Sequence, residues 1–240
     1  MRSAALLAFA LSIAPQIVLA QSCPEPLASA TRLVVVVADD FTTSTATVQR
    51  FERSSQAAPW RADSGPVSAL IGLKGMAWAQ SFRSLAAKGE PVKYDGDKRI
   101  PAGLYRIGSS FGFAAARRAN YRQIKEGTVC VDDALSPAYN TITTRAEVGW
   151  KVHGENMWRV PDYRNGLVLQ YPTDAKLRAG SCIFIHVALP GKTGTAGCVA
   201  LPEPEVLKLQ SFAEGGAVIA VLPRHALPRL SCLPSSGSAR

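Results

Sequence analysis

The sequence has few of the residues from which metal and nucleotide sites are built. Histidine occurs three times in 240 residues and cysteine five times. His186 and Cys198 lack the spacing of zinc-binding pairs, and there is no second pair to complete such a site. Lys192 follows a glycine but lacks the strand, Gly-rich turn and helix of a phosphate-binding loop. We therefore expect no metal ion and no cofactor.

The chain also lacks a concentrated block of charge. It has 27 Lys and Arg against 18 Asp and Glu, a net charge of +9, and the charges are scattered. The densest basic stretches are residues 117–118 and 122–125. We expect no nucleic-acid partner, because neither a basic stripe nor a known nucleic-acid-binding module is present. A basic surface suits an anionic cell envelope, although a solvated face is the simpler explanation.

Long apolar runs are missing after the N-terminus. Arg2 followed by the apolar stretch 4–14 and by Val18-Leu19-Ala20 is typical of a secretory signal peptide, residues 1–20. Pro15 interrupts this stretch, which is too short and Ala-rich for a stable membrane span, although an uncleaved anchor is the alternative. No other segment is long enough to cross a bilayer. We expect an exported protein of the periplasm or cell envelope, without a transmembrane segment in the mature chain.

The most informative segment runs from Ser181 to Leu201. Residues 182–187 form an apolar run typical of a strand, and His186 stands near its end. A loop rich in glycine and proline then leads to Cys198, so one strand end and one loop supply a thiol and a base. A thiol needs such a base to become a nucleophile at neutral pH. Gly197 before Cys198 is expected to leave backbone N–H groups free for an oxyanion. The segment therefore predicts nucleophilic catalysis.

The spacing Ile185-His186-x(8)-Thr195-Ala196-Gly197-Cys198 resembles the signature of the YkuD-type L,D-transpeptidases, in which a His precedes a Ser/Thr-x-Gly-Cys motif. The resemblance covers roughly residues 65 to 222. Other similar segments are 93–97, 100–108, 111–113, 130–133, 139–140 and 155–157, with Ser136 and Trp150. Two positions depart from the commoner motif: Ala196 stands where the family has His, and Ala200 stands where it has Arg.

The resemblance implies a peptidoglycan L,D-transpeptidase. In that reaction the thiolate of Cys198, activated by His186, would attack a stem peptide, and an amine acceptor would resolve the thioester. Peptidoglycan stem peptides are the expected partners, and a carbapenem is expected to acylate Cys198. The alternatives are a Cys/His hydrolase (an L,D-carboxypeptidase or amidase) and a catalytically silent envelope-binding module. Papain-like and NlpC-type peptidases place Cys before His in the chain, which argues against them.

Five further residues are candidates for binding substrate. Asp132 and Asp133 either contact a cationic part of the substrate or begin a turn, and Tyr139 and Asn140 either neighbour the cleft or serve the local structure. Thr195 either binds substrate or steadies the catalytic loop by hydrogen bonding.

An odd number of cysteines leaves one unpaired in an oxidising compartment. Cys198 is the natural free thiol, because a disulfide would block it as a nucleophile; a structural cysteine is the alternative. We pair Cys130 with Cys182, and Cys23 with Cys232. The sequence alone allows fifteen ways of leaving one cysteine out and pairing four.

Apolar and β-branched runs predict strands, and turn clusters separate them. Together with the resemblance, they predict a mainly-β single domain, a β-sandwich of the L,D-transpeptidase catalytic type with one or two short helices, at residues 31–222. Residues 21–30 are expected to form an irregular lead-in and residues 223–240 a Pro/Ser-rich tail. One helix is expected from residue 202 or 203 to the glycines at 215–216, and a shorter one around 114–121. The expected strands are 31–38, 45–51, 66–73, 103–107, 167–171, 182–187 and 217–222.

Overall fold

The computed structural model describes residues 23–115, 118–173 and 175–234, and the statements below concern these residues. The expected signal peptide, residues 1–20, lies outside the described residues. No helix in the described ranges has both the length and the apolar content that crossing a membrane requires.

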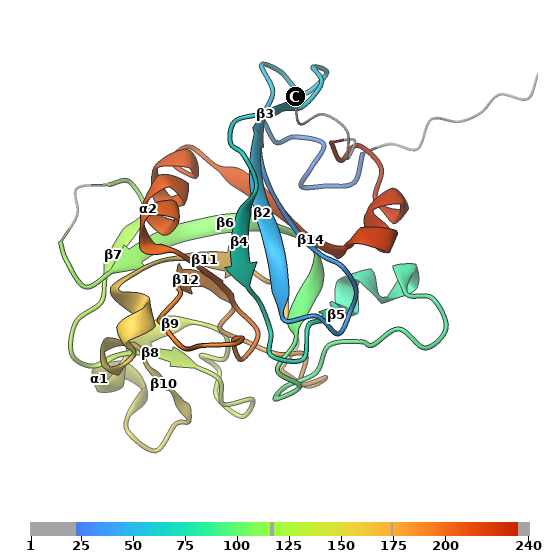
Figure 1. Ribbon diagram of the computed structural model, residues 1–240. Helices are drawn as coiled ribbons and strands as arrows, with labels where there is room; N and C mark the ends of the chain where they lie inside the picture. The colour runs from blue at the N-terminus through green and yellow to red at the C-terminus, as the bar shows by residue number, and fades with distance from the viewer. Residues whose placement is uncertain (1–22, 116–117, 174, 235–240) are drawn as a thin grey trace, which may run out of the picture.

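Most strands belong to one sheet that closes on itself (Figure 1). Its hydrogen-bonded path runs β1-β14-β6-β11-β12-β13-β4-β2, and β2 pairs with β1 to complete the ring. The mainly-β prediction is confirmed. The sandwich is not confirmed, because the strands of this path form one continuous ring. The strands of this sheet are β1 (Arg32–Ala38), β2 (Thr45–Glu52), β3 (Arg61–Ala62), β4 (Val67–Leu70), β5 (Met76–Trp78), β6 (Ile100–Gly112), β7 (Tyr121–Gln123), β11 (Asn165–Gln170), β12 (Phe184–Val187), β13 (Val199–Leu201) and β14 (Ala217–Pro223).

The valine run of β1 explains why the ring is stable. β1 pairs parallel with β14 and antiparallel with β2, and most of its side chains are buried. A short continuous apolar run suits a strand that is covered on both faces. The long strand β6 serves both halves of the ring, since it pairs with β14 through residues 103–107 and with β11 through residues 106–112. Aliphatic side chains from these strands fill the main core.

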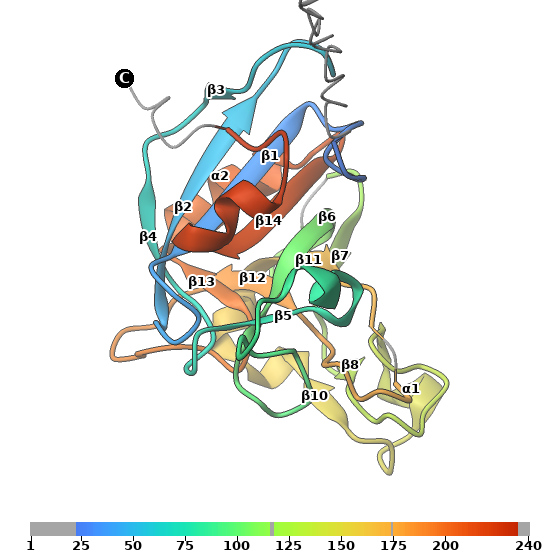
Figure 2. The ribbon, with the colours of Figure 1, turned by 90° about the vertical axis from the view of Figure 1, so that its right-hand side faces the viewer.

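A second, three-stranded sheet lies beside the ring (Figures 1 and 2). It consists of β8 (Thr128–Val131), β9 (Ile142–Thr144) and β10 (Gly154–Asn156). The short helix α1 (Arg145–Val148) follows β9 and begins with a capping box formed by Thr144 and Glu147. A disulfide between Cys130 and Cys182 ties β8 to the segment that leads into β12. The second sheet is therefore held next to the strand that carries His186.

The expected longer helix is confirmed as α2 (Glu203–Phe212). Glu203 and Glu205 lie in its first turn, where negative charge stabilises a helix N-terminus. The buried amide of Gln210 donates hydrogen bonds to the carbonyls of Phe111 and Gly166, which fixes α2 against β6 and β11. The shorter helix expected around 114–121 is not found there. The described part of that range forms bends and a turn that lead into β7, and α1 is the second helix instead.

The two ends of the described chain meet. Cys23 forms a disulfide with Cys232, whose carbonyl also accepts a hydrogen bond from the indole of Trp60. Four 3-10 helices complete the structure: η1 (Gln80–Leu85), η2 (Met157–Arg159), η3 (Pro161–Arg164) and η4 (Arg224–Arg229). η4 lies in the expected tail region and is held by an ion pair between Arg229 and Glu90. Both predicted disulfides are thus confirmed, and Cys198 is free.

Candidate active site

β12 and β13 bring the predicted thiol and base to the same face of the sheet. The two strands are parallel, and Ile185 pairs with Val199 while His186 pairs with Ala200. Cys198 immediately precedes β13 and therefore lies opposite Phe184. Because side chains alternate between faces, His186 and Cys198 project to the same side. Cys198 stands two residues before Ala200, the strand partner of His186. The side chains of Ile185 and Val199 project to the other side, into the main core.

His186 is held in the orientation that a general base requires. Its Nδ1 lies 3.0 Å from the carbonyl oxygen of Val187, which can only accept, so Nδ1 carries the hydrogen and Nε2 is left as the basic nitrogen. Asp162 Oδ2 lies 3.8 Å from the same Nδ1, and the ring of Tyr163 packs edge-on against the imidazole at 5.5 Å. Burial lowers the pKa of His186 below its usual range. The imidazole is therefore neutral and able to accept a proton.

Cys198 is a buried, protonated thiol. Its Sγ lies 3.3 Å from the backbone N–H of Phe184, which donates to it, and 3.6 Å from the carbonyl oxygen of Cys182. Burial raises the pKa of Cys198 to about 12. Within the described residues, the sulfur makes these backbone contacts in place of a hydrogen bond to the imidazole. The structure therefore holds a neutral thiol and a neutral imidazole, with the sulfur turned toward the backbone of Phe184 and Cys182.

The loop before Cys198 is fixed by Thr195. The hydroxyl of Thr195 donates to the carbonyl of Cys198 at 2.8 Å and accepts from the N–H of Gly197 at 3.1 Å. The backbone of Thr195 also bonds with Ile71 and Leu73, which joins the loop to the chain after β4. These bonds correct one expectation: the N–H of Gly197 is engaged within the loop, so it does not point freely at an oxyanion.

Gly197 is required for a different reason. Its φ of +143° lies in a region that side chains disfavour, and an added Cβ would come within 2.9 Å of the carbonyl oxygen of Arg99. The glycine therefore allows the chain to pass against residue 99 and places Cys198 at the sheet. Ala200, where the resembled family has Arg, lies opposite His186 and lines the cavity, so its small side chain leaves the space beside the base open.

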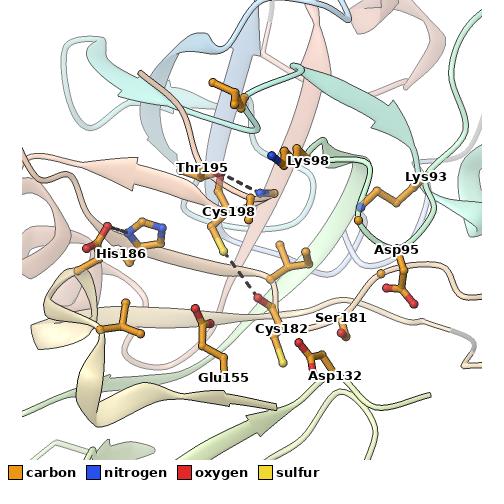
Figure 3. A pocket seen from close by; sticks show the side chains of 18 of the residues that line it. Lys93, Asp95, Lys98, Asp132, Glu155, Ser181, Cys182, His186, Thr195 and Cys198 are labelled. Carbon is orange, nitrogen blue, oxygen red and sulfur yellow. Dashed lines mark hydrogen bonds and ion pairs between the residues drawn. The ribbon is translucent and has the colours of Figure 1, made fainter. Parts of the chain in front are cut away.

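His186 and Cys198 open into a cavity of about 1250 Å³ between the ring and the second sheet. Figure 3 shows Asp132, which follows β8, and Glu155 of β10 on one side, and Lys93 and Lys98 on the opposite side. The Lys93 ammonium is buried in an ion pair with Asp97. The residues that line it include Leu73, Lys93, Asp95, Lys98, Asp132, Asp133, Glu155, Asp162, Tyr163, Arg178, Ser181, His186, Lys192, Thr195, Ala196, Cys198 and Ala200. A cavity of this volume is large for a small metabolite and suits a peptide.

The predicted substrate-binding residues divide into two groups. Asp132 and Asp133 line the cavity; Asp132 pairs with the exposed ring of His153, and Asp133 accepts from the N–H of Leu135 at 3.0 Å. Tyr139 and Asn140 are not among the described residues that line this cavity. The Tyr139 hydroxyl donates to Asp95, and Asn140 bridges the carbonyl of Tyr171 and the N–H of Cys182. Tyr139 and Asn140 therefore hold residues of the cavity wall, Asp95 and Cys182, in place by hydrogen bonds.

Three side chains that line the cavity were not predicted as site residues from the sequence: Glu155, Asp162 and Tyr163. The hydroxyl of Tyr163 donates to Glu155 Oε2 at 2.6 Å, and its ring packs against Phe184 and His186. Asp162 and Tyr163 lie in η3, a four-residue element that no periodic pattern marks. Glu155 belongs to a segment that resembles the family, but its position facing the thiol depends on the pairing of β8 with β10.

Comparisons with known proteins add no relative: no family model, no curated protein and no solved structure matches this chain.

Proposed function

We propose that this protein is a cysteine acyltransferase of the cell envelope, an L,D-transpeptidase acting on peptidoglycan stem peptides. The observation that carries the proposal is the placement of a free thiol and an oriented neutral imidazole on one sheet face at the base of one cavity. The resemblance of the His186–Cys198 segment to the YkuD-type signature supplies the substrate class. Within this proposal, the closed sheet corresponds to the β-sandwich catalytic domain of that family, joined into a ring by the pairing of β1 with β2.

Acylation begins when His186 Nε2 takes the proton from Cys198 Sγ. A thiol with a pKa raised to about 12 forms little thiolate by itself, so the base must act as the sulfur attacks. The sulfur bonds to the carbonyl carbon of the stem peptide, and the oxygen becomes an anion. Because Thr195 engages the N–H of Gly197, the N–H of Cys198 is the donor that this loop offers to the oxyanion. Protonated His186 then returns its proton to the leaving nitrogen, and a thioester remains on Cys198.

An amine from a second stem peptide resolves the thioester. Its nitrogen attacks the thioester carbon and loses a proton to His186, the carbon–sulfur bond breaks, and His186 passes that proton to the sulfur. Lys98 on one wall and Asp132 and Asp133 on the other suit peptides that carry both a carboxylate and an amine. Asp132 and Asp133 face the part of the cavity where an acceptor ammonium would be attracted.

An oxidising compartment agrees with this function. Two disulfides close the chain while Cys198 stays unpaired. Structural disulfides persist outside the cytoplasm, where peptidoglycan is assembled into the cell wall. We therefore place the protein in the periplasm or cell envelope, with a role in cell-wall biogenesis and cell shape.

The first test is intact-mass analysis after exposure to a carbapenem. The wild-type protein is expected to gain one adduct, because ring opening acylates Cys198, and Cys198→Ala is expected to gain none. Thr193→Ala, on an exposed position of the same loop, serves as the matched control and should react like wild type. An equal adduct on Cys198→Ala, or none on wild type, would overturn the proposal.

The second test separates transfer from hydrolysis. A defined tetrapeptide donor is incubated with and without an acceptor amine, and the products are identified by mass. A cross-linked or amine-exchanged product is expected. Cleaved monomer alone would instead support the Cys/His hydrolase, and an unreactive Cys198 would support a silent envelope-binding module.

A further inference from the structure

Glu155 is a carboxyl group at the active site for which the two-residue mechanism has no role. It lies on β10 and lines the cavity with Cys198 and His186. Figure 3 shows its carboxyl group directed toward the sulfur of Cys198. Its hydrogen-bond partner among the described residues is the hydroxyl of Tyr163. No Lys or Arg of the described residues forms an ion pair with it, so it is not half of a structural salt bridge.

The position of Glu155 relative to the thiol is held by a strand pairing, a disulfide and a hydrogen-bond contact. Glu155 pairs with Cys130 in the antiparallel ladder of β10 and β8. Cys130 is bonded to Cys182 through the disulfide, and the carbonyl of Cys182 contacts the sulfur of Cys198. The second sheet therefore connects Glu155 to the thiol through two residues, Cys130 and Cys182. A carboxyl group held in this way is preorganised for a reaction on the substrate.

The surroundings of Glu155 favour its protonated form. Burial is the main cause that raises the pKa of Glu155, and the negative charges of Asp132 and Asp162 act in the same direction, while the Tyr163 hydroxyl opposes them. The other titratable groups near it are the thiol of Cys198, the imidazole of His186 and the ring of His153, which pairs with Asp132. A carboxyl group with a raised pKa keeps its proton to higher pH than a free glutamate does, which suits a general acid that later acts as a base.

We propose that Glu155 is a catalytic residue that gives a proton to the amine released in acylation and takes a proton from the acceptor amine. This inference rests on the proposed function. In acylation, His186 moves the thiol proton to the leaving nitrogen, and Glu155 donates a second proton that converts the released amine to an ammonium ion. Glu155 is then ionised. In the second half-reaction it takes one proton from the incoming acceptor ammonium, which frees the nitrogen lone pair for attack on the thioester.

The proton balance closes over one turnover. The acceptor ammonium loses one proton to Glu155 and one through His186 to the departing sulfur, and the new amide keeps the third. Glu155 regains the proton it gave to the leaving amine, and Cys198 regains its thiol hydrogen. No other co-reactant is needed.

The test separates the two half-reactions. A stem-peptide donor whose scissile bond is a carboxylic ester acylates Cys198 without releasing an amine, and intact mass follows the thioester. Because the released alcohol takes no second proton, Glu155 is ionised with this donor only by losing its proton to solvent as the pH rises. Amide and hydrolysed acid products are therefore measured across pH with a D-amino acid as acceptor. Glu155→Gln is expected to form the thioester at the wild-type rate within about threefold, but to lose ~10²-fold in aminolysis, because a positioned acid or base contributes about that much. Glu126→Gln, an exposed glutamate near the same sheet, is the matched control and should behave like wild type.

Tyr163→Phe provides an independent measurement. It removes the hydroxyl that stabilises ionised Glu155, so the midpoint of the aminolysis profile should move to higher pH. Equal aminolysis by Glu155→Gln and wild type, or an unmoved midpoint in Tyr163→Phe, would overturn the role of Glu155. If wild type forms no thioester with the ester donor, the proposed function itself fails, which is a distinct outcome.

Discussion

The two faces of β12 and β13 differ in what they contribute to the protein. On one face Ile185, Val187 and Val199 belong to the main aliphatic core. On the other, Phe184 and Cys198 belong to a smaller cluster with Phe111 and aromatic neighbours, next to His186 and the cavity. All of these residues are buried, yet these residues of the first face are aliphatic whereas the second face holds a thiol, an imidazole and aromatic rings.

This difference shows how a short strand serves stability and chemistry together. The aliphatic face contributes the free energy of burying apolar surface, which does not depend on orientation. The aromatic face contributes a buried setting in which an imidazole is kept neutral and a thiol is kept protonated. Mutations on the two faces should therefore separate stability from activity.

The disulfides offer the largest contrast. Replacing Cys23 and Cys232 with alanine removes a disulfide between residues 209 positions apart, and loop-closure entropy predicts a loss of about 5 kcal/mol in the free energy of unfolding. Replacing Cys130 and Cys182 removes one between residues 52 positions apart, with a predicted loss of about 4 kcal/mol. We expect both double variants to unfold at lower denaturant concentration. Only the second should also slow carbapenem acylation under folding conditions, because it frees the second sheet from the thiol. Equal acylation by the two variants would show that the second sheet does not position the site.

Substitutions at Ile185 and His186, neighbours in β12, should separate an effect on stability from an effect on acylation. Ile185→Ala is expected to cost about 2–5 kcal/mol in the free energy of unfolding, because it leaves a cavity in the main core. His186→Gln is expected to slow acylation by ~10²–10⁴-fold through loss of the base, with a much smaller change in stability. Denaturant titration and time-resolved intact mass measure the two effects. A large stability loss in His186→Gln would mean that the imidazole serves the core instead.

Alanine substitutions at two glycines of the loop before Cys198 distinguish the effect of backbone strain from the effect of close packing. Gly197→Ala combines a φ of +143° with a Cβ only 2.9 Å from the carbonyl of Arg99, so we expect a cost of about 1–3 kcal/mol and acylation slowed at least about 10-fold. Gly191→Ala has a φ of +77° but meets nothing within 4 Å, and should affect stability slightly and acylation not at all. If both variants acylate equally, the position of the thiol does not depend on Gly197.

The smallest predicted effect is on the pH dependence of acylation. Because burial lowers the pKa of His186, its neutral, basic form persists to lower pH than in a free histidine. The acid limb of the acylation profile should therefore lie below ~6.5, the ordinary histidine value. His186 also contributes a loss of stability as pH falls through ~6.5, because the unfolded chain then binds a proton that the folded chain still excludes.

Asp162→Asn sharpens that prediction. The charge of Asp162 opposes the burial effect, so its removal should move the acid limb to still lower pH. Acylation by the ester donor, measured between pH 4 and 8, checks both shifts. An acid limb above 6.5 in wild type would contradict a buried, neutral base.

Several strands could be predicted from local patterns because a buried strand needs a continuous apolar run. The valines of β1 and the apolar run of β14 are examples, and both strands lie close to the expected residues. The helix α2 was predicted from its proline and acidic first turn and from the glycines that follow it. The closed ring was not predicted, because it depends on the pairing of β1 with β14, whose residues lie far apart in the chain.

The sequence by itself determined the chemistry available: a histidine and a cysteine joined by a tight Gly-rich loop, and four other cysteines that pair elsewhere. Only the tertiary structure decided which atoms face one another. Strand register places His186 and Cys198 on one face, the hydroxyl of Thr195 engages the Gly197 N–H, and the second sheet brings Glu155 to the thiol. The physical reason is that residue types are local, whereas burial, register and hydrogen-bond partners depend on segments that meet only in the folded chain.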